Sequence, residues 1–291
     1  MMGMELLADS DLISMSVVFD GQVRRALARD AGLNIAQYRV LTLSNVREGG
    51  TTARAAAEAL AMKKSLFSQT MKSLVSAGLA EVTGKSSEKA YVCTSRGHAA
   101  LAAADAAVAF EHMGFFGCLG EEAYRNLLAG SVVTSVFFDV ARMDEGKFMA
   151  EFANLDGCLR SELFYKTIAQ KHGLPLSGLR VLLALGERNG SLGQSEISRF
   201  LVLRKSKVTE ACQGLQASGL IDRKPMPLDK RNSIAVATQA GEKLTSAIIA
   251  SIASESENYI RPVAQGEIGF YVEVARITMG SLRMNRKRMQ L

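Results

Sequence analysis

The chain has 291 residues, a length sufficient for two domains, and 48% of its residues are hydrophobic. Only 4 residues are proline, so the composition excludes a disordered chain and favours a folded, largely helical one. The net charge of +6 permits a polyanionic partner but does not establish one.

The cysteines and the N-terminal sequence favour a cytoplasmic protein. The four cysteines are widely spaced and form no CxxC pair, and no secretory signal opens the chain. We therefore expect reduced thiols. The Ala-rich stretch after Ala99 is interrupted by Asp105 and Glu111, so we expect no membrane-spanning helix.

The first half of the chain predicts a helix-turn-helix followed by a hairpin. Helical periodicity predicts a helix over Ala53–Leu60 and a second over Ser65–Ala77, which Gly78 would end in a left-handed conformation. Two strands, Ala80–Thr83 and Ala90–Cys93, then flank the tip "GKSSEK". The second helix would bury Phe67, Met71 and Leu74 and expose Ser65, Ser68, Gln69 and Lys72.

The second half predicts the same order of elements. Ser191 is the expected cap of a helix over Gln194–Leu201, and the next helix runs over Ser206–Ser218 and stops at Gly219. Strands over Leu220–Lys224 and Ser233–Ala237 enclose a charged tip of Asp229, Lys230 and Arg231, and long helices follow. The helix before the hairpin would bury Val208, Cys212 and Leu215 and expose Ser206, Thr209, Glu210 and Gln213.

The two halves are similar in sequence as well as in element order. Leu33–Ala80 aligns without a gap to Leu174–Ile221, with 12 identities in 48 positions. After the hairpins the alignment resumes, pairing Thr94 with Thr238 and Gly97 with Gly241. We therefore predict a duplicated domain, with residues 1–145 as the first copy and 146–291 as the second.

These residues resemble the multiple antibiotic resistance regulator (MarR) family of winged-helix transcription factors. The resemblance is clearest in "LRVLLAL", "SEISRFLVLRKSKVTEACQGLQASGLIDRKPMPLDKRN" and "ATQAGEKL". The family's Asp-x-Arg wing pattern and its later Thr-x-x-Gly are met by Asp229, Arg231, Thr238 and Gly241. The resemblance implies a mainly α fold with small β wings, that is, two winged helix-turn-helix domains. Because family members are normally homodimers, it also implies that long helices join the two copies into a single-chain pseudo-dimer.

The resemblance implies a double-stranded DNA-binding regulator, a repressor by family habit, released by a small and often aromatic ligand. The recognition helix would enter the major groove and the wing the adjacent minor groove. No enzymatic or cofactor motif is present, so we expect neither catalysis nor a cofactor. The expected DNA-binding residues are Ser65, Ser68, Gln69, Lys72, Lys85 and Lys89 in the first copy, and Ser206, Lys207, Thr209, Gln213, Asp229, Lys230 and Arg231 in the second.

The chain departs from the family pattern at two places. The first wing has no Asp-x-Arg, and Lys85 and Lys89 are the only cations at its tip. The second recognition helix carries Glu210 where the family usually has a basic or neutral residue. We therefore expect an asymmetric, pseudo-palindromic operator. The alternative is a protein-interaction scaffold whose DNA binding is weak or lost.

Other candidate residues have plainer explanations. Cys158 fits an oxidant sensor less well than a small buried hydrophobe, because no basic partner to lower its pKa is evident. The three histidines are too dispersed for a zinc site. Core packing is favoured over an effector pocket for Met113, Phe115, Phe116, Phe137 and Phe138. The tail "RMNRKRM" could equally contact phosphates or be solvated.

Overall fold

The computed structural model describes residues 5–46, 49–84, 89–133, 150–226, 229–260 and 268–285. The chain forms two compact units, which we call the first unit (Phe19–Gly157) and the second unit (Met1–Val18 with Cys158–Leu291). The predicted boundary between residues 145 and 146 lies outside the described residues. Packing thus assigns the first 18 residues to the second unit and the start of the second copy to the first unit.

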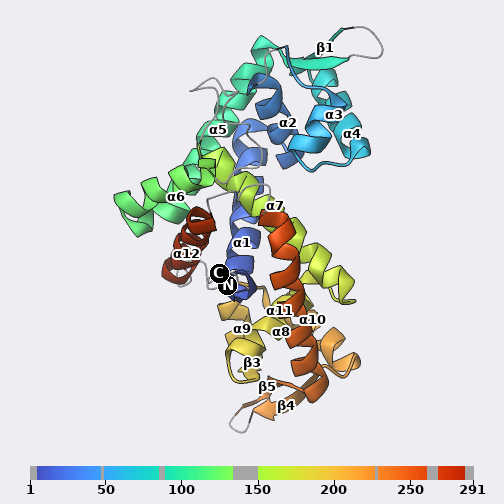
Figure 1. The fold of residues 1–291 in the computed structure, drawn as a ribbon, viewed down its shortest axis with the longest axis vertical. Coiled ribbons are helices and arrows are strands. Elements are labelled where there is room, and N and C mark those ends of the chain that lie inside the picture. Colours follow the sequence, from blue (N-terminus) through green and yellow to red (C-terminus); the bar gives the residue numbers. More distant parts are fainter. Residues whose placement is uncertain are drawn as a thin grey trace. The chain divides into compact units, whose positions relative to one another are not determined.

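The first unit is built from helices and one two-stranded sheet (Figure 1). Helix α1 continues through a π-helical turn at Leu27–Ala31, and a 3-10 turn at Gly117–Leu119 precedes α6. The elements that belong to it wholly or in part are α1 (Ser10–Ala26), α2 (Ile35–Val46), α3 (Ala53–Ala59), α4 (Lys64–Ser76), β1 (Ala80–Thr83), β2 (Ala90–Cys93), α5 (Ser95–Phe116), α6 (Glu121–Val133) and α7 (Ala150–Lys171).

The second unit repeats the pattern with a larger sheet (Figure 1). A 3-10 turn at Glu5–Ala8 precedes the start of α1, and the greater part of α7 belongs here. Its other elements are α8 (Leu176–Glu187), β3 (Ser191–Gly193), α9 (Gln194–Phe200), α10 (Lys205–Ala217), β4 (Ile221–Met226), β5 (Asp229–Ala237), α11 (Gln239–Ile260) and α12 (Ile268–Asn285).

The predicted fold class is confirmed, since the described chain is mainly helical with small antiparallel sheets. Strands β1 and β2 have the predicted bounds and pair antiparallel, with Ala80 opposite Cys93. The second sheet has the order β3-β5-β4, and sequence analysis did not predict β3. The prediction that Ser191 caps the next helix was therefore wrong. Ser191 lies in β3, and Gly193 caps α9 while its amide donates to Glu196 Oε2 at 2.8 Å.

Helix α5 corrects the expectation about membrane spans. Residues 95–119 are long and apolar enough to cross a membrane by length and composition, despite Asp105 and Glu111. A core helix of a folded domain passes the same test. Several apolar side chains of α5 are buried in the first unit, namely Leu101, Ala104, Val108, Phe115 and Phe116.

The turn between the two helices of each helix-turn-helix has the same backbone conformation. Ala61 and Val202 occupy equivalent positions and have positive φ angles of 48° and 50°. Such angles are rare for residues other than glycine, above all for a β-branched valine. Gly78 and Gly219, which end α4 and α10, both have φ of 69°, as their role in the left-handed cap predicts.

An arginine supports each of these turns, half-buried in the first unit and buried in the second. In the first unit Arg39 Nη2 donates to the Leu60 carbonyl at 2.8 Å and to Asp156 Oδ1 at 2.5 Å. In the second unit Arg180 Nη2 donates to the Leu201 carbonyl and to Ser14 Oγ. Burial lowers the pKa of Arg180 to about 10. Each guanidinium therefore holds the residue that precedes the positive-φ position.

The Thr-x-x-Gly sequence joins each wing to the long helix that follows. Thr238 Oγ1 donates to the Gly219 carbonyl at 2.7 Å and accepts from the Gly241 amide at 3.1 Å. Thr94 makes the same two contacts with Gly78 and Gly97, at 2.7 and 3.0 Å. The threonine thus ties the first turn of the long helix to the end of the recognition helix.

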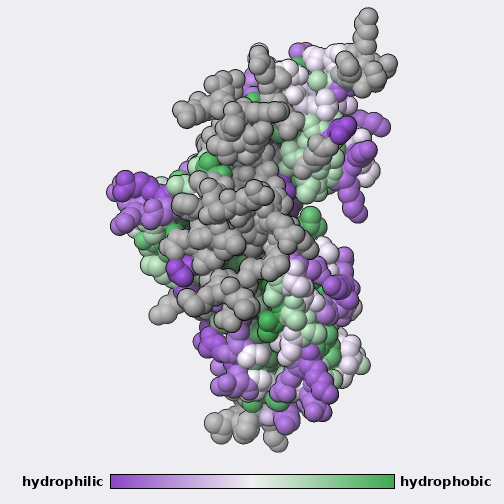
Figure 2. Space-filling view, viewed as in Figure 1, coloured by the Kyte–Doolittle hydropathy of each residue, from purple (hydrophilic) through white to green (hydrophobic). Residues whose placement is uncertain are grey.

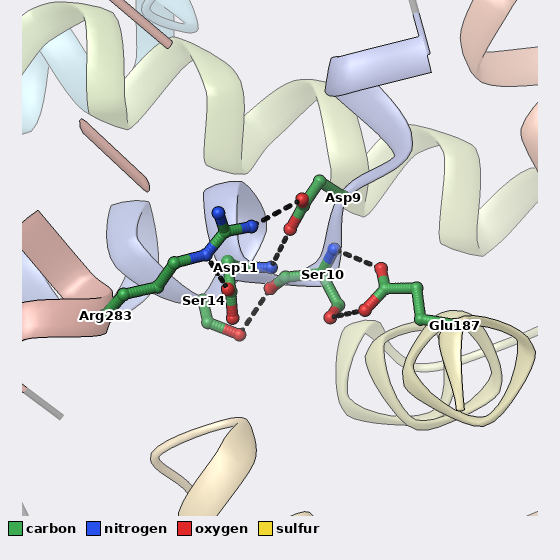
Figure 3. A network of polar contacts seen from close by, with 6 residues as sticks. All are labelled: Asp9, Ser10, Asp11, Ser14, Glu187 and Arg283. Carbon is green, nitrogen blue, oxygen red and sulfur yellow. Dashed lines mark hydrogen bonds and ion pairs between the residues drawn. The ribbon is translucent and has the colours of Figure 1, made fainter. Parts of the chain in front are cut away.

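The start of α1 is held in the second unit by a polar network (Figure 3). The amide and hydroxyl of Ser10 donate to the two carboxylate oxygens of Glu187, each at 2.7 Å. Arg283 in α12 donates to Asp11 at 2.8 Å and to Asp9 at 3.1 Å. Burial raises the pKa of the Glu187 carboxyl. This network connects α1, α8 and α12.

Candidate nucleic-acid interface

Helix α10 has the two faces that its sequence predicts. Val208, Cys212 and Leu215 are buried, together with Ala211. The predicted outward residues Ser206, Glu210 and Gln213 are exposed, Lys207 is exposed beside them, and Thr209 is half-buried. Burial of the apolar side fixes the rotation of the helix, so its polar side faces solvent.

Two contacts organise the polar side of α10. Lys207 Nζ lies 2.9 and 2.8 Å from the two carboxylate oxygens of Glu210, one helical turn later. Thr209 Oγ1 donates to the Lys205 carbonyl at 3.0 Å, so its hydroxyl is already used within the helix. The carboxylate of Glu210 is therefore held in place by a cation on its own helix.

Helix α4 presents the equivalent face in the first unit. Ser65, Ser68, Gln69 and Lys72 are exposed, while Phe67, Met71 and Leu74 are buried, as predicted. Hydrophilic residues gather over α4 (Figure 2). Leu66, which is equivalent to Lys207, is 46% exposed on the same helix.

The second wing differs from its predicted form. Strand β4 continues through Pro225 to Met226, and β5 begins at Asp229, so Asp229, Lys230 and Arg231 lie in a strand and not in an irregular tip. Pro225 is tolerated because β4 is the edge strand of its sheet. The side chains of residues 226–232 lie outside the described part of the structure.

Several cations can be located around the two helices. In the first unit Lys63, Lys64, Lys72 and Lys89 are exposed, while Lys85 lies outside the described residues. In the second unit Lys205 and Lys224 are exposed. Arg223 is half-buried, and its Nη2 donates to Ser233 Oγ across the wing at 3.2 Å. Exposed cations therefore flank both helices.

Cys158 and His112 are buried, His172 is half-buried and His98 is exposed. Cys158 is 5% exposed in α7, which agrees with the favoured explanation of a small buried residue. His112 is buried, whereas His172 Nε2 lies 2.9 Å from Ser251 Oγ. Among the described residues, no group of three histidine, cysteine or acidic side chains could hold a metal ion.

The aromatic candidates divide between core and surface. Phe115 and Phe116 are buried and pack against Phe19, with ring centroids 5.7 and 5.2 Å away. Met113 is 54% exposed. Phe137 and Phe138 lie outside the described residues. The core explanation therefore holds for the two buried rings.

A buried histidine and a half-buried aspartate in the first unit have shifted pKa values. His112 Nε2 lies 3.2 Å from Asn154 Oδ1 and Nδ1 lies 3.0 Å from the Tyr124 hydroxyl. Burial lowers the pKa of His112 to about 4. Burial raises the pKa of Asp105 to about 6, although the Tyr38 hydroxyl donates to its carboxylate at 2.8 Å.

These shifts predict opposite pH effects on stability. His112 is protonated near pH 6.5 in the unfolded chain but only near pH 4 in the folded one. The stability of the folded state therefore falls as the pH is lowered from about 6.5 to about 4. Asp105 ionises near pH 3.8 in the unfolded chain but only near pH 6 in the folded one. The stability of the folded state therefore falls as the pH rises from about 3.8 to about 6.

We expect Asp105→Asn to raise the free energy of unfolding at pH 7.5, where the half-buried carboxylate is charged, and to have little effect near pH 4. Urea unfolding followed by circular dichroism at both pH values measures this difference. Asp30→Asn is the control, because Arg29 lowers the pKa of that exposed carboxyl and the pH dependence should not have the same sign. An equal gain for Asp105→Asn at both pH values would contradict the assigned shift.

Sequence analysis missed two functional features. Arg39 and Arg180 align between the two halves, and a charge within the apolar stretches "YRVLTL" and "LRVLLAL" signals a buried polar contact that was given no role. Sequence analysis treated Glu210 as a departure from a pattern, although the spacing to Lys207 is that of a helical ion pair. Both signals were present in the sequence.

The sequence model of the MarR family matches residues 172–232. No curated protein matches the chain. A crystal structure of MarR is 22% identical, covering 50% of this chain and 98% of that one, with a TM-score of 0.42. Reduced AbfR bound to DNA is 27% identical, covering 35% and 71%, with a TM-score of 0.33. AbsC, a MarR family transcriptional regulator from Streptomyces coelicolor, is 16% identical, covering 44% and 83%, with a TM-score of 0.36.

The family match begins directly after α7 and spans all of α8, β3, α9, α10 and β4, and the start of β5. Those are the elements that carry the polar face and the wing. Residues 172–232 thus contain a helix-turn-helix followed by a wing, and this segment matches the sequence model of the MarR family.

Proposed function

We propose that the chain is a sequence-specific, double-stranded DNA-binding transcription regulator of the cytoplasm. The observation that carries the proposal is the polar face of α10, which is exposed between cations within the segment that matches the MarR family. A helix of this kind fits the major groove, where side-chain donors and acceptors reach base edges. The flanking lysines would contact phosphates.

We further propose that the two units are tandem copies, so that one chain acts as a pseudo-dimer on two half-sites. Support comes from the paired details of the two units, namely the positive-φ turns, the arginines that support them and the threonine contacts. Repression, and release by a small aromatic ligand, are part of this proposal by resemblance to the family.

A second candidate function is a protein-interaction scaffold with weak DNA binding. One observation favours it: Leu66 and Val75 on α4 are 46% and 38% exposed, so apolar side chains border the polar face of this helix. Salt dependence distinguishes the two functions. DNA affinity that falls steeply with salt supports the regulator, whereas weak binding without base preference supports the scaffold.

We expect Arg231→Ala to weaken binding to DNA that flanks the gene much more than Lys85→Ala, because only the second wing carries Asp-x-Arg. Removing a phosphate-contacting cation should also reduce the slope of log affinity against log salt by about one. Gel-shift titrations at several salt concentrations measure both quantities. The control is Lys171→Ala, which removes an exposed cation paired with Glu255 on α11. Equal losses for Arg231→Ala and Lys85→Ala would rule out the asymmetry.

A further inference from the structure

The recognition helices of the two units carry different side chains at one equivalent, exposed position. Ser65 and Ser206 align, and four residues later Gln69 aligns with Glu210. In each helix the buried side is also equivalent, with Phe67 and Met71 in α4 matching Val208 and Cys212 in α10. The rotation of both helices is therefore fixed in the same way, and Gln69 and Glu210 project from matching places.

We propose that Glu210 selects a cytosine in one half-site and that Gln69 selects an adenine at the matching position of the other. The inference rests on the proposed DNA-binding function and adds the bases that each unit reads. A carboxylate only accepts hydrogen bonds, and cytosine presents its N4 amine as a donor in the major groove. A glutamine amide both donates and accepts, which matches N7 and N6 of adenine.

Lys207 makes an acidic side chain tolerable beside DNA. An unpaired carboxylate on this face would be repelled by the phosphates, but the Lys207 ammonium contacts both oxygens of Glu210. Glu210 remains 69% exposed in its side chain, so further lone pairs are open to a donor. The ion pair therefore presents an acceptor without adding net negative charge.

The same two positions of α4 are both neutral. Leu66 replaces Lys207, and Gln69 replaces Glu210, so the cation and the acid are present together or absent together. Leu66 is exposed on the reading face and is suited to contact the C5 methyl group of thymine. An exposed leucine beside a glutamine thus favours an A·T-rich half-site for the first unit, whereas Glu210 favours a C·G pair for the second.

The test is a selection of random-sequence duplexes by the full-length chain, followed by titrations against duplexes that vary one base pair. Wild type should enrich cytosine in one half-site and adenine in the other. In the half-site where wild type prefers cytosine, Glu210→Gln should make adenine the preferred base. The affinity for adenine relative to cytosine at that position should rise by about tenfold. The double substitution Leu66→Lys with Gln69→Glu should make the opposite change in the other half-site.

The matched control is Glu121→Gln on α6, which neutralises an exposed glutamate that also has a basic partner, Arg125, on its own helix. It should leave base preference unchanged. If Glu210→Gln strengthens binding to all sequences without changing the preferred base, Glu210 is only the charge partner of Lys207 and the inference is overturned. If wild type binds DNA without salt dependence or base preference, the proposed function fails, and this inference fails with it.

Discussion

Gly241→Ala should lower the free energy of unfolding of the second unit by about 3 kcal/mol. A Cβ at this position would collide with the carbonyl oxygen of Leu220. That carbonyl accepts a hydrogen bond from the Thr238 amide at 3.1 Å, while the Leu220 amide donates to Leu215 at 2.9 Å. The amide and the carbonyl of Leu220 are therefore both held by hydrogen bonds. To make room for the new Cβ, α11 would have to shift away from the end of α10.

Urea unfolding followed by circular dichroism measures this loss, with Gly214→Ala in α10 as the matched control. A Cβ at Gly214 would meet no atom of another element within 4 Å. Because alanine favours helix over glycine, Gly214→Ala should raise stability by about 0.5–1 kcal/mol. A similar small gain for Gly241→Ala would show that α11 can move freely against Leu220.

Gly97→Ala should have the same effect in the first unit, since its Cβ would collide with the Leu79 carbonyl. Thr94 makes the contacts there that Thr238 makes in the second unit. The Thr-x-x-Gly sequence is thus explained by geometry. Threonine caps the long helix, and glycine lets that helix approach the end of the recognition helix.

The elements that sequence alone predicted well are those decided by local signals. The predicted bounds of β1 and β2 match the structure, and α4 and α10 lie within one residue of their predicted bounds. Apolar residues at helical spacing fix the buried side of each recognition helix, and Gly78 and Gly219 mark its end. The outward faces of α4 and α10 follow from the same spacing.

Long-range pairing accounts for what sequence did not predict. Strand β3 has three residues, which are too few to show the alternating pattern of a strand. It forms because Ser191 pairs with Val236, a residue distant in sequence. The predicted strand ends at Lys224, before Pro225, whereas β4 continues to Met226 because an edge strand tolerates proline. No local pattern indicates that Met1–Val18 packs with the second unit, because that choice depends on partners such as Glu187 and Arg283 that are distant in sequence.

Asp156→Ala should destabilise the first unit by about 3 kcal/mol, because it leaves the largely buried Arg39 guanidinium without the Asp156 carboxylate. The side chains of Asp156 and Arg39 are 2% and 13% exposed, so water cannot replace the lost partner well. Arg39 also supports the helix-turn-helix through the Leu60 carbonyl, so the loss reaches the turn before α4.

A double-mutant cycle separates the value of the pair from the cost of breaking it. Arg39→Met with Asp156→Leu removes both charges, and it should recover most of the stability that either single change loses. Urea unfolding of the four proteins gives the coupling energy, which we expect to be about 2 kcal/mol. The exposed pair Lys171–Glu255 in the second unit is the control, with an expected coupling below about 1 kcal/mol. Equal coupling for the two pairs would mean that burial does not strengthen the Arg39–Asp156 interaction.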